Sequence, residues 1–482
     1  MLFNSIEFTL FLPVVFLLYW FVFNRNIRLQ NLFIVAASYL FYGWWDWRFL
    51  ILIFFTSLCS YVAGRLIESR PRQARWISAA NIVLNLGILC TFKYYDFFIQ
   101  SFADLFGFAA DSLLLKIILP VGISFYTFQA LSYSIDVYRK KLQATHDIAA
   151  FFAYISFFPQ LVAGPIERAT NLLPQFLRSR TFDITQATDG VRQALWGLFK
   201  KMVVADNCAI LANYVFENHA TESGSMLILG ALAFTFQIYG DFSGYSDIAI
   251  GVSRLFGFEL MRNFHFPYFS RDIAEFWRRW HISLNTWFRD YIYIPLGGSR
   301  GSKASIIRNT FVIFLLSGLW HGANWTFVVW GAYNALLFLP LILAQRNRRN
   351  LGEIAEGRIF PSGREIIRIA ATFILIVIGW IIFRAENIGH AWEYISRICS
   401  PALFEPVIWP DSWFETAFIH SLIGIVLLQT VEWFQRSKQH ALQFNRGGVI
   451  RFSAVRFSIY YLLLIAIYLM FAQQQAFIYF QF

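Results

Sequence analysis

Two histidines carry the chemistry that this chain offers inside apolar surroundings, and the first is His321. It lies within Ser317–Trp325, which reads SGLWHGANW and belongs to the run Phe311–Ala344, where no Asp, Glu, Lys or Arg occurs. A buried imidazole or amide without a hydrogen-bond partner costs about 1–3 kcal/mol. His321 and Asn324 therefore need polar partners or a water-filled cavity, and ionisable groups at membrane depth are candidate functional residues.

Small residues surround this histidine. Gly318 and Gly322 are four residues apart, a spacing that lets a neighbouring helix or a ligand approach the backbone closely. If the helix continues past Gly322, Asn324 lies on the face of His321, where an amide orients the imidazole or donates to a developing oxyanion. A histidine bonded to a neighbouring helix explains the glycine pair but not the aromatic cluster. The supporting residues predicted here are Trp320, Asn324 and Trp325.

The second histidine, His281, lies in a stretch that is both charged and aromatic, Arg271–Tyr291. Helical spacing would place on one face the side chains of Trp277, His281, Leu284, Phe288 and Tyr291. The stretch is too charged to cross a bilayer, so we expect an amphipathic helix at the cytoplasmic interface or inserted into the bundle. A core histidine held by a backbone carbonyl is the plainer interpretation. The functional one adds Trp277 and Asn285 as supporting residues.

A third polar group interrupts the apolar range 226–251, and its candidate site residues are Asp241 and Tyr245. The full set is Gln237, Tyr239, Asp241, Ser243, Tyr245, Ser246 and Asp247. Such a density of polar side chains suits the wall of a cavity better than a lipid-facing surface.

These residue types favour proton transfer. A neutral imidazole acts as a general base at pH 7, and a positioned base contributes about 10²–10⁴-fold to a rate. The sequence has no P-loop, dinucleotide fingerprint or metal-ligand spacing, and its four cysteines are far apart, so no metal site is predicted. A base, a polar donor and a shielded cavity suit acyl transfer. The same histidines would also suit a proton relay in a transporter.

The composition is that of an all-α polytopic membrane protein. Of 482 residues, 57% are hydrophobic and 14% are charged, whereas soluble proteins carry about 25% charged residues. We attribute the net charge of +11 to basic cytoplasmic loops and not to a surface that binds nucleic acid. Helices that span a bilayer need about 20 mostly apolar residues, and the sequence predicts about 11–12 of them.

The predicted spans follow the chain in order. They are 5–23, 30–45, 49–64, 77–98, 115–135, 203–216, 226–251, 308–323, 325–344, 364–383, 414–433 and 457–475. Basic loops fall on every second connection in the N-terminal part, which places the N-terminus on the periplasmic or extracellular side of the cytoplasmic membrane. Residues 149–165 are short and broken by Pro159 and Pro165, as in a re-entrant segment. Residues 187–202 resemble an interfacial helix.

No linker divides the chain, so we expect a single membrane domain over 1–482. It comprises N-terminal helices at 1–145, a catalytic core at 146–345 and C-terminal helices at 346–482. No internal repeat of 20–50 residues is visible, which weakens the transporter interpretation.

The sequence resembles the membrane-bound O-acyltransferase (MBOAT) family, in its bacterial polysaccharide O-acetylation branch. The resemblance is carried by Phe158–Ile166, Asp241–Asp247, Phe276–Leu284 with Tyr293–Gly298, and Ser317–Trp325. It maps the family's buried catalytic histidine to His321 and its second functional histidine to His281. His265 stands where the family pattern leads us to expect Asn, and it is given no role.

The resemblance implies a ring of helices around a thin centre, where a cytoplasmic tunnel meets an outer funnel. It implies acetyl-CoA as the acetyl donor, with no permanently bound cofactor, and an extracytoplasmic partner of the SGNH-hydrolase type. The acceptor is a polysaccharide such as alginate, peptidoglycan or cellulose, reached through that partner. The alternatives left open are acylation of a lipid or secreted protein, and transport of a polysaccharide or lipid intermediate by a histidine relay.

Overall fold

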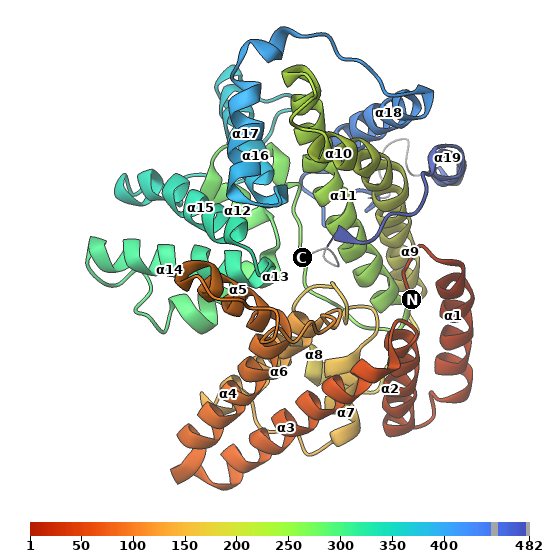
Figure 1. The fold of residues 1–482 in the computed structure, drawn as a ribbon. Coiled ribbons are helices and arrows are strands. Elements are labelled where there is room, and N and C mark those ends of the chain that lie inside the picture. The colour runs from red at the N-terminus through yellow and green to blue at the C-terminus, as the bar shows by residue number, and fades with distance from the viewer. Residues whose placement is uncertain (445–451, 479–482) are drawn as a thin grey trace. The chain divides into compact units, whose positions relative to one another are not determined.

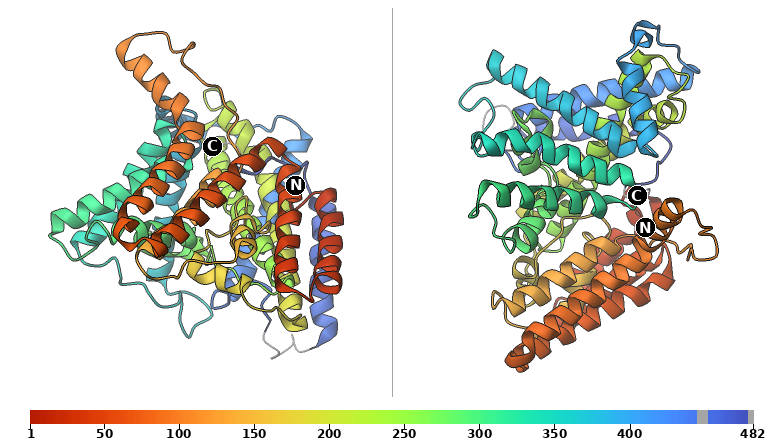
Figure 2. Two further views of the ribbon diagram at one scale, coloured as in Figure 1. Left: turned by 90° about the horizontal axis from the view of Figure 1, so that it is seen from below. Right: turned by 60° about the vertical axis from the view of Figure 1, so that its left-hand side comes forward.

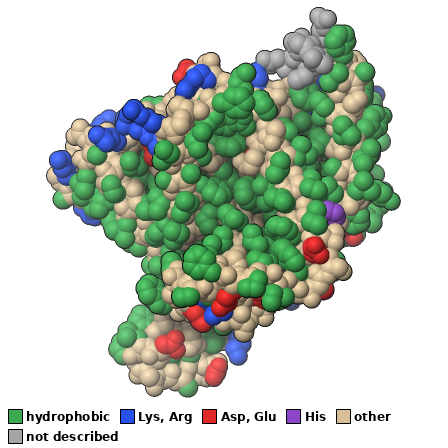
Figure 3. Space-filling model, turned by 90° about the horizontal axis from the view of Figure 1, so that it is seen from above, with side chains coloured by type: hydrophobic (Ala, Val, Ile, Leu, Met, Phe, Trp, Pro, Cys, Tyr) green, Lys and Arg blue, Asp and Glu red, His purple; other side chains and the backbone are tan. Residues whose placement is uncertain are grey.

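The computed structural model describes residues 1–444 and 452–478, and within these ranges it contains helices and no strand (Figure 1). Eight helices are long and apolar enough to cross a membrane by length and composition: α3, α4, α11, α14, α15, α16, α18 and α19. Figure 3 shows hydrophobic side chains over much of the face it presents, as lipid contact requires. The expectation of an all-helical membrane protein is confirmed.

The eight long helices among the described residues are fewer than the expected count of about 11–12. The difference lies in helices shorter than 18 residues. These are α1 (Ile6–Leu17), which continues as a π-helix to Val22, α2 (Ile27–Gly43), α6 (Ile123–Tyr138) and α10 (Asp206–Glu217). Each coincides with a predicted apolar segment, so the segments are present and only their helical length is smaller.

The chain divides into two compact units. Unit 1 contains residues 1–191 and 249–261, and unit 2 contains residues 192–248 and 262–482. Two of the three boundaries fall inside helices, α9 (Ile184–Phe199) and α11 (Gly224–Leu255), and the third falls at 261/262 in a connection; none coincides with the limits of the three stretches expected from sequence. The single-domain assignment stays a prediction.

Unit 1 is held together by polar contacts between apolar helices. Its remaining helices are α3 (Leu50–Ser69), α4 (Ala74–Lys93), α5 (Tyr95–Phe106), α7 (Ile148–Ser156) and α8 (Ala169–Phe176). The distant segment 249–261 accepts hydrogen bonds from two N-terminal side chains, since Tyr19 Oη donates to the carbonyl of Phe256 at 3.0 Å and Trp20 Nε1 to that of Leu255 at 2.9 Å. These bonds satisfy groups that would be costly to leave unpaired.

The predicted re-entrant segment is a short helix followed by turns. Helix α7 ends at Ser156, and residues 157–166 are all buried within unit 1. The backbone N–H of Phe158 donates to Ser38 Oγ at 3.1 Å. Irregular backbone is tolerated at membrane depth only where protein or water surrounds it, and here protein does so.

Unit 2 contains the two candidate histidines. Besides α10 and the unit 2 parts of α9 and α11, its helices are α12 (Ile273–Arg279), α13 (Ile282–Phe288), α14 (Lys303–His321), α15 (Trp325–Leu343), α16 (Gly363–Arg384), α17 (Ile388–Ile398), α18 (Ser412–Phe434) and α19 (Ser453–Met470). Helices α14 and α15 pack side by side, as Figure 2 shows. The two backbones approach closely at Gly318 and Gly331, where an added Cβ would collide with the backbone of the opposite helix. The glycine pattern therefore serves close helix packing.

The single amphipathic helix expected over 271–291 is wrong. The stretch forms two short helices, with α12 ending at Arg279 and α13 beginning at Ile282. The side chain of Asn285 bridges the break, because its Nδ2 donates to the carbonyls of Trp277 at 2.7 Å and Trp280 at 2.6 Å. Because of this break, His281 belongs to neither helix, and its side chain is buried inside unit 2.

Candidate functional site

His321 is the last residue of α14 and lies in an aromatic cluster inside unit 2. Its side chain is buried, and its ring centroid lies 5.0 Å from that of Trp320, 5.2 Å from Trp330 and 5.3 Å from Phe383. The three rings come from α14, α15 and α16, so the packing of three helices fixes the position of one imidazole. Such a shielded imidazole is suited to proton transfer away from bulk water.

Trp320 lies against both histidines. Its ring centroid is 5.7 Å from that of His281 and 5.0 Å from that of His321. On its other side, His281 contacts the edge of Phe242 at 4.6 Å. The structure thus brings His281, Trp320 and His321 together, although forty residues separate the two histidines in sequence.

Asn263 holds His281 in one orientation. Its Oδ1 accepts from the backbone N–H of Ser283 at 3.3 Å and from Ser283 Oγ at 2.9 Å, and it lies 3.2 Å from His281 Nδ1. The backbone N–H of Ser283 can only donate, so the Asn263 side-chain atom that faces it is the oxygen. An amide oxygen can only accept, so His281 Nδ1 donates to it. The proton of the neutral imidazole is therefore on Nδ1, and Nε2 carries the lone pair.

The backbone at His281 is in the left-handed region. Its φ is 43° and its ψ is 54°, a conformation that is uncommon outside glycine, although asparagine, aspartate and histidine adopt it more often than other residues. Residues held in this way often lie at functional sites, where the surrounding structure over-determines them. Here the N–H of the next residue, Ile282, donates to the carbonyl of Asn263 at 2.8 Å and secures the turn.

Burial lowers the pKa of His281 to about 3, against about 6.5 for a free histidine. The folded protein keeps this imidazole neutral while the unfolded chain takes up a proton below about pH 6.5, so stability falls as the pH drops, by up to about 1.4 kcal/mol per pH unit. His281→Asn removes the titrating ring and tolerates the left-handed backbone. We expect its apparent Tm to fall less than that of wild type between pH 7.5 and pH 5. Equal acid shifts in thermal unfolding would contradict this.

The expectation that Asn324 shares a helix face with His321 is wrong. Helix α14 ends at His321, and Gly322 is extended with φ −165° and ψ 159°. Asn324 instead caps α15: its Oδ1 accepts from the N–H of Thr326 at 3.0 Å, and its Nδ2 donates to the carbonyl of Glu386 at 2.8 Å. Trp325 begins α15 with 51% of its surface exposed, so it lies outside the buried cluster.

Asp241 belongs to a buried ion cluster. Lys201 Nζ lies 2.8 Å from Asp206 and 2.9 Å from Asp241, whose other oxygen accepts from the N–H of Ile478 at 2.7 Å. Buried Tyr245 packs on Phe477 at 5.1 Å. The residue after Asp241, Phe242, contacts His281, with 4.6 Å between the ring centroids.

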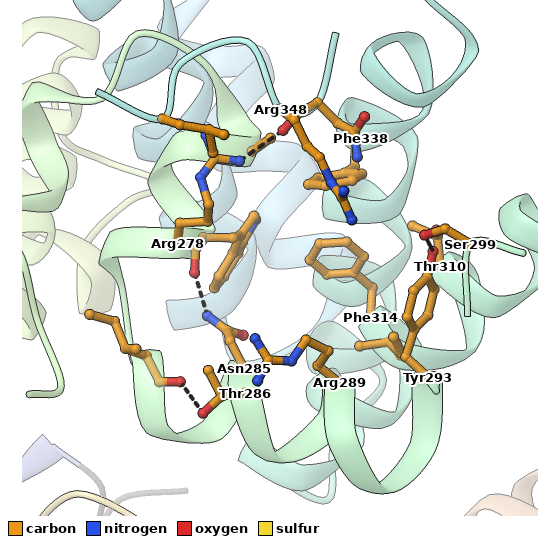
Figure 4. Close-up of a pocket in the computed structure, with 16 residues that line it drawn as sticks. Arg278, Asn285, Thr286, Arg289, Tyr293, Ser299, Thr310, Phe314, Phe338 and Arg348 are labelled. Atoms are coloured by element: carbon orange, nitrogen blue, oxygen red, sulfur yellow. Dashed lines mark hydrogen bonds between the residues drawn. The ribbon is translucent and has the colours of Figure 1, made fainter. Parts of the chain in front are cut away.

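A cavity of about 650 Å³ lies beside α12 and α13 (Figure 4). Its volume is within the range of small-molecule sites, about 300–1,000 Å³. The lining residues are Ala274, Trp277, Arg278, Ile282, Asn285, Thr286, Arg289, Tyr293, Ser299, Thr310, Ile313, Phe314, Phe338, Asn347, Arg348 and Leu351. Two sequence-predicted residues, Trp277 and Asn285, are among them.

Trp277 connects the cavity with the histidine cluster. It lines the cavity and its ring centroid lies 5.7 Å from Phe314 and 5.5 Å from Trp330, which in turn contacts His321. Two rings, Trp277 and Trp330, therefore lie between the cavity and the imidazole.

Several site residues were not predicted from sequence. They are Asn263, Trp330, Phe383, Arg289 and Arg348. Asn263 lies two residues before His265, and from the sequence we considered only His265 in this segment. In the structure, His265 Nε2 lies 3.1 Å from the carbonyl oxygen of Arg436. Trp330 and Phe383 lie in apolar spans, where no sequence signal separates them from lipid-facing residues. Among the described residues no group of His, Cys, Asp and Glu has the arrangement of a metal site.

Comparison with known proteins gives a consistent assignment. Residues 139–353 match the family described as MBOAT, membrane-bound O-acyltransferase family. The chain is 44% identical over 408 residues to a "probable alginate O-acetylase" of Pseudomonas aeruginosa, covering 83% of this chain and 75% of the relative. It is 33% identical over 427 residues to the peptidoglycan O-acetyltransferase of Helicobacter pylori, covering 82% and 79%.

A more distant similarity extends to another transferase. Over 284 residues the chain is 26% identical to the teichoic acid D-alanyltransferase of Bacillus subtilis, covering 56% of this chain and 70% of the relative. The family match includes both candidate histidines and the whole cavity lining. The chain therefore belongs to the membrane-bound O-acyltransferase family and is an enzyme of its O-acetyltransferase kind.

Proposed function

We propose that this enzyme takes acetyl groups from cytoplasmic acetyl-CoA and passes them across the membrane for O-acetylation of an extracytoplasmic polysaccharide. The observation that carries the proposal is the pair of buried imidazoles that both contact Trp320, in a cluster that Trp330 and Trp277 connect to a cavity lined by three arginines. The relatives' names, which specify O-acetylation of alginate and of peptidoglycan, support an acetyl group and a polysaccharide acceptor. Alginate, peptidoglycan, cellulose and similar polymers all fit this description.

His321 is the general base in this mechanism. An acceptor hydroxyl attacks the thioester carbonyl while His321 takes the hydroxyl proton, the carbon–sulfur bond breaks, and the thiolate receives the proton from the imidazolium to leave as free CoA. The acetyl carbon exchanges one sulfur bond for one oxygen bond, so atoms and charge balance. The aromatic cluster excludes water, which would otherwise hydrolyse the thioester.

His281 positions the thiol side of the donor. Its neutral tautomer, with the proton on Nδ1 bonded to Asn263, presents the Nε2 lone pair, which accepts from a thiol or amide donor. Burial keeps the ring neutral, as its pKa of about 3 indicates, so positioning by a hydrogen bond is favoured over stabilisation by a positive charge.

The proposed location is the bacterial cytoplasmic membrane, with the N-terminus outside. The basic loops after the first, third and fifth predicted spans support this orientation. We propose that a periplasmic or extracellular protein of the SGNH-hydrolase type completes transfer to sugar hydroxyls. The described part of this chain is occupied by helices and short connections, which leaves the polymer to be held by such a partner.

The decisive experiment supplies the purified enzyme in nanodiscs with acetyl-CoA labelled in the acetyl group. We expect time-dependent release of CoA thiol, and label on the acceptor when partner and polymer are added. A transporter with a histidine relay would move its substrate without consuming acetyl-CoA, and this result would contradict the proposal. Mass spectrometry of cell wall and exopolysaccharide from a deletion strain identifies the acceptor and also detects acylated lipid or protein.

A further inference from the structure

Two further histidines of unit 2, His219 and His390, stack on each other and have no part in the mechanism above. His219 lies in the turn after α10, and His390 lies in the first turn of α17 (Figure 1). Their ring centroids are 3.8 Å apart and their planes differ by 13°. One turn along α17, Tyr394 stacks on Phe216 of α10 at 4.5 Å. The two segments therefore meet through two pairs of rings, and a change of charge on either imidazole acts directly on their contact.

The surroundings of His219 fit a protonated ring. Its Nδ1 lies 3.2 Å from the carbonyl oxygen of Phe216, and its Nε2 lies 3.3 Å from Oε2 of Glu393. A carbonyl oxygen and a carboxylate can only accept, so each ring nitrogen needs a hydrogen to bond its neighbour. A neutral imidazole carries one such hydrogen and an imidazolium carries two. The imidazolium satisfies both contacts, and the carboxylate of Glu393 balances its charge.

The surroundings of His390 favour a neutral ring. Burial is the largest cause that lowers its pKa, and the neighbouring His219 and Arg384 lower it further, while Glu386 and Glu393 act in the opposite direction. The ring also lies at the N-terminus of α17, where the helix dipole disfavours a cation. The other neighbours of α17, which are α15 and the short 3₁₀ helix that follows α17, contain no charged side chain and no histidine. The stack therefore holds one charge, and a second is costly.

A short segment connects the stack with the surroundings of His321. At its start, Phe383 contacts the His321 ring at 5.3 Å. Three residues later, the carbonyl of Glu386 accepts from Asn324 Nδ2 at 2.8 Å, and Asn324 follows His321 by three residues. Four residues after Glu386 comes His390. The contact of α17 with the turn after α10 thus secures the far end of a segment whose near end packs on the proposed base.

The connections on either side of α16 differ in charge. The connection before it, 344–362, contains four arginines and two glutamates, whereas the connection after it, 385–411, contains four acidic residues and one arginine. In the proposed orientation the basic connection is cytoplasmic. The stack then lies on the extracytoplasmic side, where it meets the pH of the surroundings and not the buffered pH of the cytoplasm.

We propose that the stack of His219 and His390 is a pH-sensitive latch, which is closed while His390 is neutral and is released when His390 takes up a proton, loosening residues 383–390 beside His321. Two imidazolium rings at 3.8 Å repel each other, and burial strengthens the repulsion. A released His390 has the ordinary pKa of about 6.5, above its pKa in the latch, so protons favour release as the pH falls below about 6.5. The latch does not depend on the proposed function; its effect on acetyl transfer does.

The test follows hydrogen–deuterium exchange of residues 386–398 in the purified enzyme in nanodiscs, between pH 7.5 and pH 5.5. His390→Phe keeps a flat ring that can stack on the imidazolium of His219 but cannot take up a proton. His390→Gln is a second neutral side chain, which keeps the test decisive if the first variant does not reach the apparent Tm of wild type. His420→Phe is the matched control, because His420 is a half-buried histidine of another helix, α18.

After correction for intrinsic exchange rates, opening of this segment in wild type should rise by up to about tenfold per pH unit below about pH 6.5, because release takes up one proton. His420→Phe should respond as wild type does, whereas both variants of His390 should show no such rise. The latch is overturned if the His390 variants respond to acid like wild type, or if wild type itself does not respond.

Acetyl transfer supplies a separate readout. In proteoliposomes with only the outer pH lowered, kcat of wild type should fall reversibly, and His390→Phe should retain more of its activity at pH 5.5. If the enzyme transfers no acetyl at any pH, the proposed function fails and the exchange result still decides the latch. If exchange responds to acid while kcat of wild type and His390→Phe change equally, the coupling of the latch to His321 is overturned.

Discussion

Replacing His321 by alanine is expected to lower acetyl transfer by about 10²–10⁴-fold, the contribution of a positioned general base. The ring is buried between Trp320, Trp330 and Phe383, and Trp320 also contacts His281. The loss should appear in kcat more than in KM, since the ring acts on the proton in the transition state. Single-turnover transfer from labelled acetyl-CoA measures it.

The matched control is His420→Ala. His420 also lies in a long apolar helix, α18, but it is only half-buried and belongs to no polar cluster. We expect near wild-type transfer from this variant, with membrane insertion of both variants equal to wild type by quantitative blotting. Full activity of His321→Ala at normal insertion would remove the assignment of the base.

The second large effect is expected at Gly318, where a single methyl group should disrupt the site. A Cβ at this position would collide with the backbone carbonyl of Phe327 in α15, which cannot rotate away as a side chain can. Overpacking of this kind costs about 1–3 kcal/mol. His321 follows by three residues on the same helix, and a displacement of about 1 Å can lower a rate by about 10²-fold. Gly318→Ala should therefore lose both apparent Tm and kcat.

Gly87→Ala is the control for this substitution. Gly87 also lies within a helix, α4, but it is exposed and nothing lies within 4 Å of an added Cβ. There alanine should stabilise the helix by about 0.5–1 kcal/mol. A Gly318→Ala variant with the Tm and rate of wild type would show that α14 and α15 separate without consequence for His321.

The histidines were predictable because a membrane makes polar residues conspicuous. His321 lies in an apolar run without charged residues, where a purely structural role rarely accounts for a histidine. The aromatic neighbours of His281 in the sequence indicated that its side chain is buried. The break between α12 and α13 was not predictable, since no glycine or proline marks it in Trp277–Asn285. There the hydrogen bonds that Asn263 accepts from Ile282 and Ser283 override the helical pattern, which would otherwise continue from one seven-residue helix into the next.

The same limit applied to Asn324 and to the cavity. Gly322 permits a helix to continue or to end, and the choice depends on what lies beyond it; here the Asn324 side chain begins a new helix and reaches the carbonyl of Glu386. Arg348 was assigned to a cytoplasmic loop, and Arg278 and Arg289 to the charged stretch 271–291. That the three line one cavity depends on three segments meeting, which periodicity within one segment cannot reveal.

The interleaved boundaries of the two units have a consequence for biogenesis. Unit 1 begins at the first residue but is completed only by residues 249–261, so a ribosome must deliver all of 192–248 before it can close. Until then Tyr19 and Trp20 lack the carbonyls of Phe256 and Leu255 that they bond in the finished protein. A nascent chain arrested at residue 191 should remain protease-sensitive, whereas one arrested beyond residue 261 should acquire the protection of the completed unit.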